Sequence, residues 1–146
     1  MKPVMEIDEY GTKKWILNGL LHREDGPAIE SLDGHNEWWI NGKLHREDGP
    51  AVKWDDGSKE WIVDGRYHRE DGPAIEWEDG QKEWWINDER HREDGPAIEW
   101  EDGQKEWHIN GNNITDQINK DIKDGIFKPY DQWTESDIIK FKLKYL

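Results

Sequence analysis

The chain has 146 residues, of which 33% are hydrophobic and 37% are charged, and its formal net charge is −14. This length suffices for one domain of ordinary size but not for two domains with separate cores. The acidic charge disfavours binding to phosphate backbones and anionic membranes, and the absence of cysteine excludes disulfides and thiolate chemistry.

The N-terminal segment MKPVMEIDEYG lacks the apolar region of a signal peptide. No stretch approaches the roughly 18–20 apolar residues that a membrane helix needs. We therefore expect a soluble, cytoplasmic protein. Eleven tryptophans compensate for the small number of aliphatic residues, so any core of this chain must be largely aromatic.

A 23-residue repeat occupies most of the chain. Nearly identical HREDGPA sequences begin at His22, His45, His68 and His91. Repeats of this length indicate stacked units that bury their apolar surface only against their neighbours. A degenerate first copy, which lacks the loop, places the start of the array near Val4. We predict a repeat array of about four and a half units over residues 4–112, and a separate segment over residues 113–146.

Each unit is predicted to form a β-hairpin. The sequence AIEWEDGQKEWWIN contains two β-rich runs around Asp79-Gly80, a dipeptide that favours a tight reversal. Pairing the two runs about this dipeptide sets Ile75 opposite Trp84. Stacked hairpins would form an elongated, single-layer antiparallel sheet in a mainly β fold. The sheet would advance by roughly 9.5 Å per unit and reach about 45 Å in length.

Strand alternation then gathers isoleucine and tryptophan on one face and leaves an acidic reverse face, which includes Glu83, that we expect to be solvated. Tryptophan rows at strand spacing are usually core, but an uncovered aromatic patch marks an interaction surface. Both interpretations remain open. The aromatic residues predicted to bind a partner are Trp38, Trp54, Trp61, Trp77, Trp84, Trp100 and Trp107.

The C-terminal segment has a different pattern. Ile114, Ile118 and Ile122 recur every four residues, which predicts a short amphipathic helix that Gly125 can end. The last stretch, TESDIIKFKLKYL, begins with a possible capping box at Thr134, yet its second half also alternates like a strand. For residues 135–146 we favour a helix over a strand. We expect this segment to act as an α-helical cap on the last hairpin or to cover part of the aromatic face.

The unit EWWINGKLHREDGPAIEWxDGxK resembles the MORN repeat, a 23-residue hairpin with Asn-Gly, His-Gly and Asp-Gly dipeptides. The resemblance covers residues 4–112. Compared with the MORN repeat, the Asn-Gly and the histidine lie about two positions early relative to the Asp-Gly. Arg-Glu-Asp also replaces the glycine after the histidine, so the chain resembles a MORN-like variant. HREDGPA arrays are similar to uncharacterised phage, viral and bacterial proteins. The resemblance implies an elongated sheet that makes protein or membrane contacts and has no catalytic role.

The repeated loops place histidine, arginine and two acids within four residues. Equivalent histidines would lie roughly 9.5 Å apart, whereas zinc ligands lie at about 2.0–2.1 Å from the metal, so two copies cannot share an ion. A structural role is favoured, in which Gly72 takes a positive φ and Arg69 pairs with an acid of a neighbouring unit. The rival is a row that holds an extended acidic partner. Its predicted partner-binding residues are His22, Arg23, His45, Arg46, His68, Arg69, His91 and Arg92.

Together these patterns predict a non-enzymatic, protein-binding scaffold or inhibitor of a phage or virus, which would act in the host cytoplasm. We predict no catalytic residue, no metal site and no cofactor. The partner would be a protein, with self-association through a sheet edge or the aromatic face as a further prediction. The alternative is an acidic mimic of nucleic acid that blocks a DNA- or RNA-binding host or defence factor. A metal-dependent hydrolase is the least favoured hypothesis.

Overall fold

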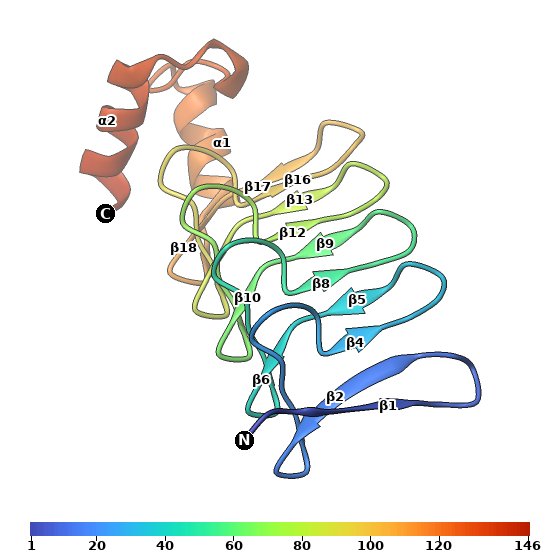
Figure 1. Cartoon of the computed structure of the whole chain (residues 1–146). Helices are drawn as coiled ribbons and strands as arrows, with labels where there is room; N and C mark the ends of the chain where they lie inside the picture. Colours follow the sequence, from blue (N-terminus) through green and yellow to red (C-terminus); the bar gives the residue numbers. More distant parts are fainter.

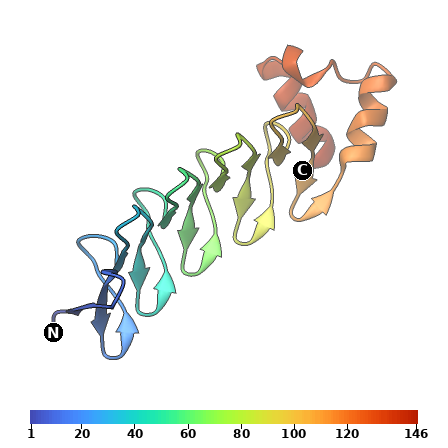
Figure 2. The same ribbon diagram turned by 90° about the vertical axis from the view of Figure 1, so that its right-hand side faces the viewer.

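The chain forms an elongated, mainly β ribbon with helices at its C-terminal end (Figures 1 and 2). The structure is a computed structural model that describes all residues, 1–146. Its main component is one open, 11-stranded antiparallel sheet, in which β3 pairs with β2 and the other strands follow the order β1-β2-β4-β5-β8-β9-β12-β13-β16-β17. The predicted fold class is therefore confirmed.

The strands of the large sheet are β1 (Val4–Ile7), β2 (Lys13–Leu17), β3 (Leu20–Leu21), β4 (Ile29–Glu30), β5 (Asn36–Glu37), β8 (Val52–Lys53), β9 (Lys59–Glu60), β12 (Ile75–Glu76), β13 (Lys82–Glu83), β16 (Ile98–Glu99) and β17 (Lys105–Glu106). Four two-stranded sheets lie beside it. They are formed by β6 (Trp39–Ile40) with β7 (Lys43–Leu44), β10 (Ile62–Val63) with β11 (Arg66–Tyr67), β14 (Trp85–Ile86) with β15 (Glu89–Arg90), and β18 (His108–Ile109) with β19 (Asn112–Asn113).

The first hairpin of each unit has a longer turn than predicted, and this changes its register. Ile75 lies opposite Glu83 and not opposite Trp84. The turn holds three residues, because the Trp77 N–H donates to the Gln81 carbonyl across it (2.9 Å). Gly80, the last of the three, takes a left-handed φ of 94°. A glycine in this conformation forms a bulge that adds one position. The shift puts Trp84 on the opposite face from Ile75, so the predicted pairing is wrong and the predicted aromatic face divides into two rows.

Each unit also contains a second hairpin that the sequence analysis missed. Val63 pairs with Arg66, and the two residues between them, Asp64 and Gly65, have φ values of 51° and 77°. Two left-handed residues in succession form the type I′ turn that suits a two-residue hairpin. The Gly65 N–H donates to the Leu44 carbonyl of the preceding unit (2.8 Å), so these hairpins are linked from one unit to the next.

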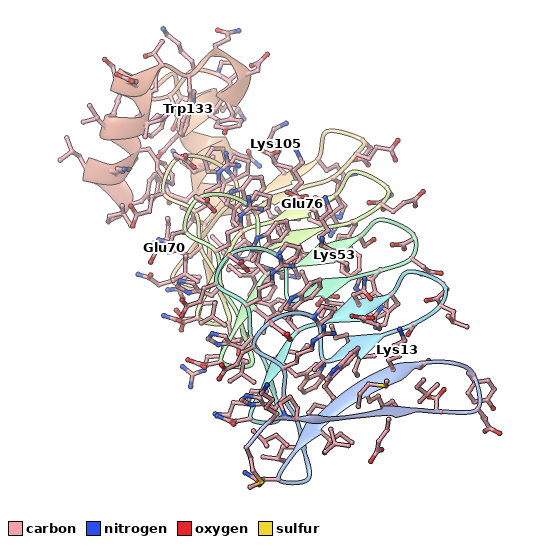
Figure 3. All side chains as sticks on the ribbon, viewed as in Figure 1. Lys13, Lys53, Glu70, Glu76, Lys105 and Trp133 are labelled. Carbon is pink, nitrogen blue, oxygen red and sulfur yellow. The ribbon has the colours of Figure 1, made fainter.

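One face of the large sheet alternates aliphatic side chains with glutamates. Directly opposed residues share a face, and Val52 lies opposite Glu60 as Ile75 lies opposite Glu83. Glu60 and Glu83 are only 7% and 6% exposed, so the prediction that Glu83 lies on a solvated face is wrong. The other face carries a row of partly to fully exposed lysines and glutamates, to which Lys13, Lys53, Glu76 and Lys105 belong (Figure 3).

The buried glutamates connect the two hairpins of a unit. Glu60 accepts a hydrogen bond from Trp54 Nε1 in the first turn (2.7 Å) and another from the Tyr67 hydroxyl in the second hairpin (2.8 Å). Burial and the hydrogen bond to Glu60 hold the Tyr67 pKa well above its ordinary value. A buried carboxylate needs hydrogen-bond partners, and here the indole and phenol groups provide them.

The C-terminal segment is helical. It consists of α1 (Thr115–Lys123), the 3₁₀ helix η1 (Tyr130–Gln132) and α2 (Glu135–Tyr145), so the preference for a helix over 135–146 is confirmed. The predicted capping box is present, with the Thr134 N–H donating to Asp137 Oδ2 (2.8 Å). Both α-helices pack on the last unit through a buried cluster of Trp107, Ile109, Ile118, Phe127 and Phe141. Neither helix is long and apolar enough to cross a membrane.

Candidate partner-binding surface

The repeated His-Arg-Glu-Asp loops stack along one side of the ribbon, and Glu70 marks this side in Figure 3. Each loop follows a second hairpin and leads into the next strand of the large sheet. The histidine and the arginine of each loop, which were predicted to bind a partner, face inward, and the two acids face solvent. The loop row therefore presents a different set of side chains from the histidines and arginines that the sequence predicted.

The arginine of each loop is held within its own unit. Arg69 stacks on the Trp61 ring, with Cζ 3.9 Å from the ring centroid. Its Nε donates to Asp71 (2.9 Å) and its Nη1 to the Pro73 carbonyl (3.0 Å). The other loops repeat this arrangement, and the four arginine side chains are only 15–22% exposed. The predicted pairing of Arg69 with an acid of a neighbouring unit is therefore wrong.

The glycine of each loop gives the arginine room. Gly72 has no positive φ, which corrects the sequence prediction. A Cβ built on Gly72 would lie 3.0 Å from Arg69 Cζ, so the residue must be small because the guanidinium crosses directly over it. Gly95 is under the same constraint and also meets Tyr130 of the C-terminal segment. The loop sequence thus encodes a close approach and not an unusual backbone conformation.

The histidines link successive units. His22 Nδ1 accepts a hydrogen bond from the backbone N–H of Asn41, at the second turn of the next copy (3.1 Å). The same bond is repeated at His45, His68 and His91, over 3.0–3.3 Å. His22 Nδ1 also lies 3.0 Å from Asn41 Oδ1, and His45 Nδ1 lies 3.0 Å from Asp64 Oδ1. These histidines therefore act in copy-to-copy contacts, and their side chains are largely buried.

The acids of the loops form the exposed part of the row. The Glu24, Glu47 and Glu70 side chains are 81–84% exposed, and Asp25, Asp48 and Asp71 are exposed to a similar degree. The hydrogen bond from the neighbouring arginine holds the pKa of each of these three aspartates below its ordinary value. Sequence reasoning missed these acids as the groups that face solvent, because only packing decides that the arginine folds back.

Three similar grooves lie between successive loops, with volumes of about 710, 750 and 720 Å³ in chain order. The walls of each groove are the Arg-Glu-Asp-Gly of one loop and the His-Arg-Glu-Asp of the next. The floors are formed by Trp38 with Ile40, Trp61 with Val63, and Trp84 with Ile86. Each groove therefore combines an apolar floor with an acidic rim.

The last groove contains a lysine from the cap. Lys142 of α2 lines it, with Nζ 4.0 Å from Glu93 Oε2. This lysine comes from the end of the chain, whereas the other residues that line the groove come from the repeat array. Lys142 was not among the sequence predictions, because the contact depends on how the cap folds back onto the array.

The predicted partner-binding tryptophans occupy three different environments. Trp38, Trp61 and Trp84 form the groove floors beneath the arginines. Trp54 and Trp77 lie on the opposite face of the sheet, are 41% and 39% exposed and donate to the buried glutamates, as described above for Glu60. Trp100 holds the equivalent position in the last unit and is partly exposed. Trp107 is buried beneath the cap, where it contacts Tyr130, Trp133 and Phe141. The structure therefore does not bring the seven together.

No group of three or more histidine, aspartate or glutamate side chains is arranged to hold a metal ion. Comparisons of the chain with protein-family models, with curated proteins and with solved structures find no match.

Proposed function

We propose that the chain is a non-enzymatic, protein-binding repeat scaffold whose loop row binds a basic segment of a partner protein. The observation that carries the proposal is the division of charge in the loops, with the arginines turned inward and the acids turned outward. An acidic partner, the earlier expectation for the arginine-bearing loops, would meet carboxylates first. The resemblance to MORN-like repeats agrees with a role in protein contact, and a host protein of a phage or virus is the proposed target.

The Lys142 contact supports a cationic partner. Lys142 lines one groove of this row, and its Nζ lies 4.0 Å from the loop glutamate Glu93. An exposed ion pair contributes only about 0.2–1 kcal/mol, so one such contact cannot hold a partner. Several grooves engaged by one chain would act together, since linking weak sites raises the overall affinity without new contacts. The proposal therefore requires an extended partner.

The spacing of the units defines this partner further. Two strands per unit advance the array by roughly 9.5 Å. Three residues of polyproline II helix span about 9.3 Å, so a basic residue at every third position would place one cation in each groove. A peptide of repeated Arg-Pro-Pro units is a direct probe. A peptide of the same composition with its arginines clustered at one end is the matched control.

The test is fluorescence anisotropy with both peptides. We expect the periodic peptide to bind more tightly than the clustered one. The triple variant Glu24→Gln, Glu47→Gln, Glu70→Gln should lose this preference. The control variant Asp55→Asn, Glu78→Gln, Glu101→Gln removes the same charge from exposed sites outside the loops and should keep it. Equal loss in both variants would show a diffuse charge effect and would overturn the loop row as the site.

Nucleic-acid mimicry is a second proposal, favoured by the confinement of the charge. Residues 22–112 contain 11 Lys plus Arg and 25 Asp plus Glu, which accounts for the whole net charge of −14. Spread over about 45 Å, this is about one charge per 3 Å, against one per ~1.7 Å for double-stranded DNA. A mimic should capture host proteins that duplex DNA or RNA releases. Captured partners that nucleic acid does not displace would contradict this second proposal.

A further inference from the structure

The two ends of the large sheet differ. At the C-terminal end the helices pack on the last unit, whereas β1 forms the other end and pairs only with β2 (Figure 1). With four residues β1 is longer than most strands of the array, and all four are exposed. Val4, Met5 and Ile7 are 66%, 44% and 58% exposed. An edge of this kind can pair with another strand.

The ladder between β1 and β2 shows which backbone groups the free edge offers. Met5 lies opposite Trp15, whose N–H donates to Ala28 and whose carbonyl accepts from His22, both on the side away from β1. Met5 and Trp15 are therefore a pair without mutual hydrogen bonds, and the N–H and C=O of Met5 point outward. Strand alternation gives Ile7 the same orientation, so β1 presents a short run of unpaired donors and acceptors.

Charge favours self-association at this end. Residues 1–21 contain three lysines and three acids and are neutral, whereas residues 22–112 carry the whole excess of negative charge. Two copies that meet through β1 bring their neutral ends together and keep their acidic parts apart. Contact along the loop row would instead oppose carboxylate to carboxylate.

We propose that β1 pairs antiparallel with β1 of a second copy, centred on Met5. In this register the two Met5 residues exchange both of their outward hydrogen bonds, and Glu6 lies opposite the second copy's Val4. The neighbouring register, centred on Glu6, would oppose two glutamates at the same point and is disfavoured. The pairing is a closed two-fold contact that joins two ribbons into one continuous sheet. It goes beyond the proposed function and does not depend on it.

A cysteine scan tests the register, because the chain has no cysteine of its own. Paired Met5 residues would have Cα atoms about 5.5 Å apart, within the roughly 4.4–6.8 Å that a disulfide spans. Under mild oxidation we expect Met5→Cys to form disulfide-linked dimers. Glu6→Cys and Ile7→Cys should not, because their copies are offset along the strands by two and four positions, roughly 7 and 13 Å.

Light scattering over a range of concentrations tests the association itself. The native chain should approach the mass of two copies. Met5→Pro removes the outward N–H and should weaken the dimer roughly tenfold or more, whereas Met5→Ala keeps the N–H and should retain it. The circular dichroism of both variants should match that of the native chain. A native chain that remains a single copy at all concentrations, or crosslinking at Ile7→Cys equal to that at Met5→Cys, would overturn the proposal.

Discussion

Gly72→Ala is expected to destabilise the protein, although its backbone conformation suits alanine. A glycine-to-alanine change without steric conflict stabilises a protein by about 0.4–1 kcal/mol, because it restricts the unfolded chain. Gly72 has no positive φ, so this gain should be available. The added Cβ would, however, lie 3.0 Å from Arg69 Cζ, and the guanidinium is held on its other side by Trp61.

Displacing the guanidinium would weaken its stacking on Trp61, worth about 0.5–2 kcal/mol, and its hydrogen bond to the Pro73 carbonyl, worth about 1 kcal/mol. The loss exceeds the gain, and we expect Gly72→Ala to reduce the free energy of unfolding by about 1 kcal/mol. In an Arg69→Ala background the conflict disappears. There the same change should increase the free energy of unfolding by about 0.4–1 kcal/mol.

The assay is urea denaturation, followed by tryptophan fluorescence, of the native chain, both single variants and the double variant. The four values give a coupling energy, which we expect to be about 1.5–2 kcal/mol. An effect of Gly72→Ala with the same sign and size in both backgrounds would refute the reasoning. It would mean that the glycine is present for the backbone and not for the arginine.

Three further predictions concern the cap and the contacts between units. Burial alone would raise the Asp121 pKa, but hydrogen bonds from Lys144, Tyr145 and Gln117 outweigh it and lower the pKa. The stability that this carboxylate contributes should be complete above the ordinary aspartate pKa and should be lost as the pH falls through the lower pKa of the folded state. In unfolding experiments at different pH, Asp121→Asn should remove this loss of stability in acid and should lower the free energy of unfolding by about 2 kcal/mol. His22→Phe should cost about 1 kcal/mol and speed amide exchange at Asn41, whereas unchanged exchange would argue against the copy-to-copy bond. Trp107→Ala should cost about 3–5 kcal/mol and reduce helical circular dichroism, whereas Trp77→Ala, at an exposed site, should cost less; equal costs would contradict the assignment of Trp107 to the core.

The sequence predicted the repeat, the open antiparallel sheet and the helical cap because periodicity and capping patterns are local signals. It did not predict the register, since whether Asp79-Gly80 forms a two- or three-residue turn depends on one residue in a bulge. That single position decides which tryptophans share a face. The Asn-Gly dipeptides were noted only as part of the repeat pattern, and their role as the turn of a second hairpin was missed.

The sequence analysis and the structure place the candidate surface in the same loops, but they differ in the side chains that these loops present. The side chains that face solvent could not be deduced from loop composition, because Arg69 has several acidic neighbours in the sequence and only packing selects Asp71. The buried glutamates were missed for a related reason. A carboxylate such as Glu60 is expected in solvent, and its burial depends on donors from two different hairpins.

The bond from each loop histidine to the following copy has a consequence for how such a chain can vary in length. His45 contacts only the next copy, which contains Asp64, and the other loop histidines do the same. A whole 23-residue segment can therefore be removed or duplicated, because the histidine bonds between the remaining neighbours are preserved. Each such change would shorten or extend the molecule by about 9.5 Å and remove or add one groove. The number of repeats in the sequence therefore sets the length of the molecule, and the cap stays at one end.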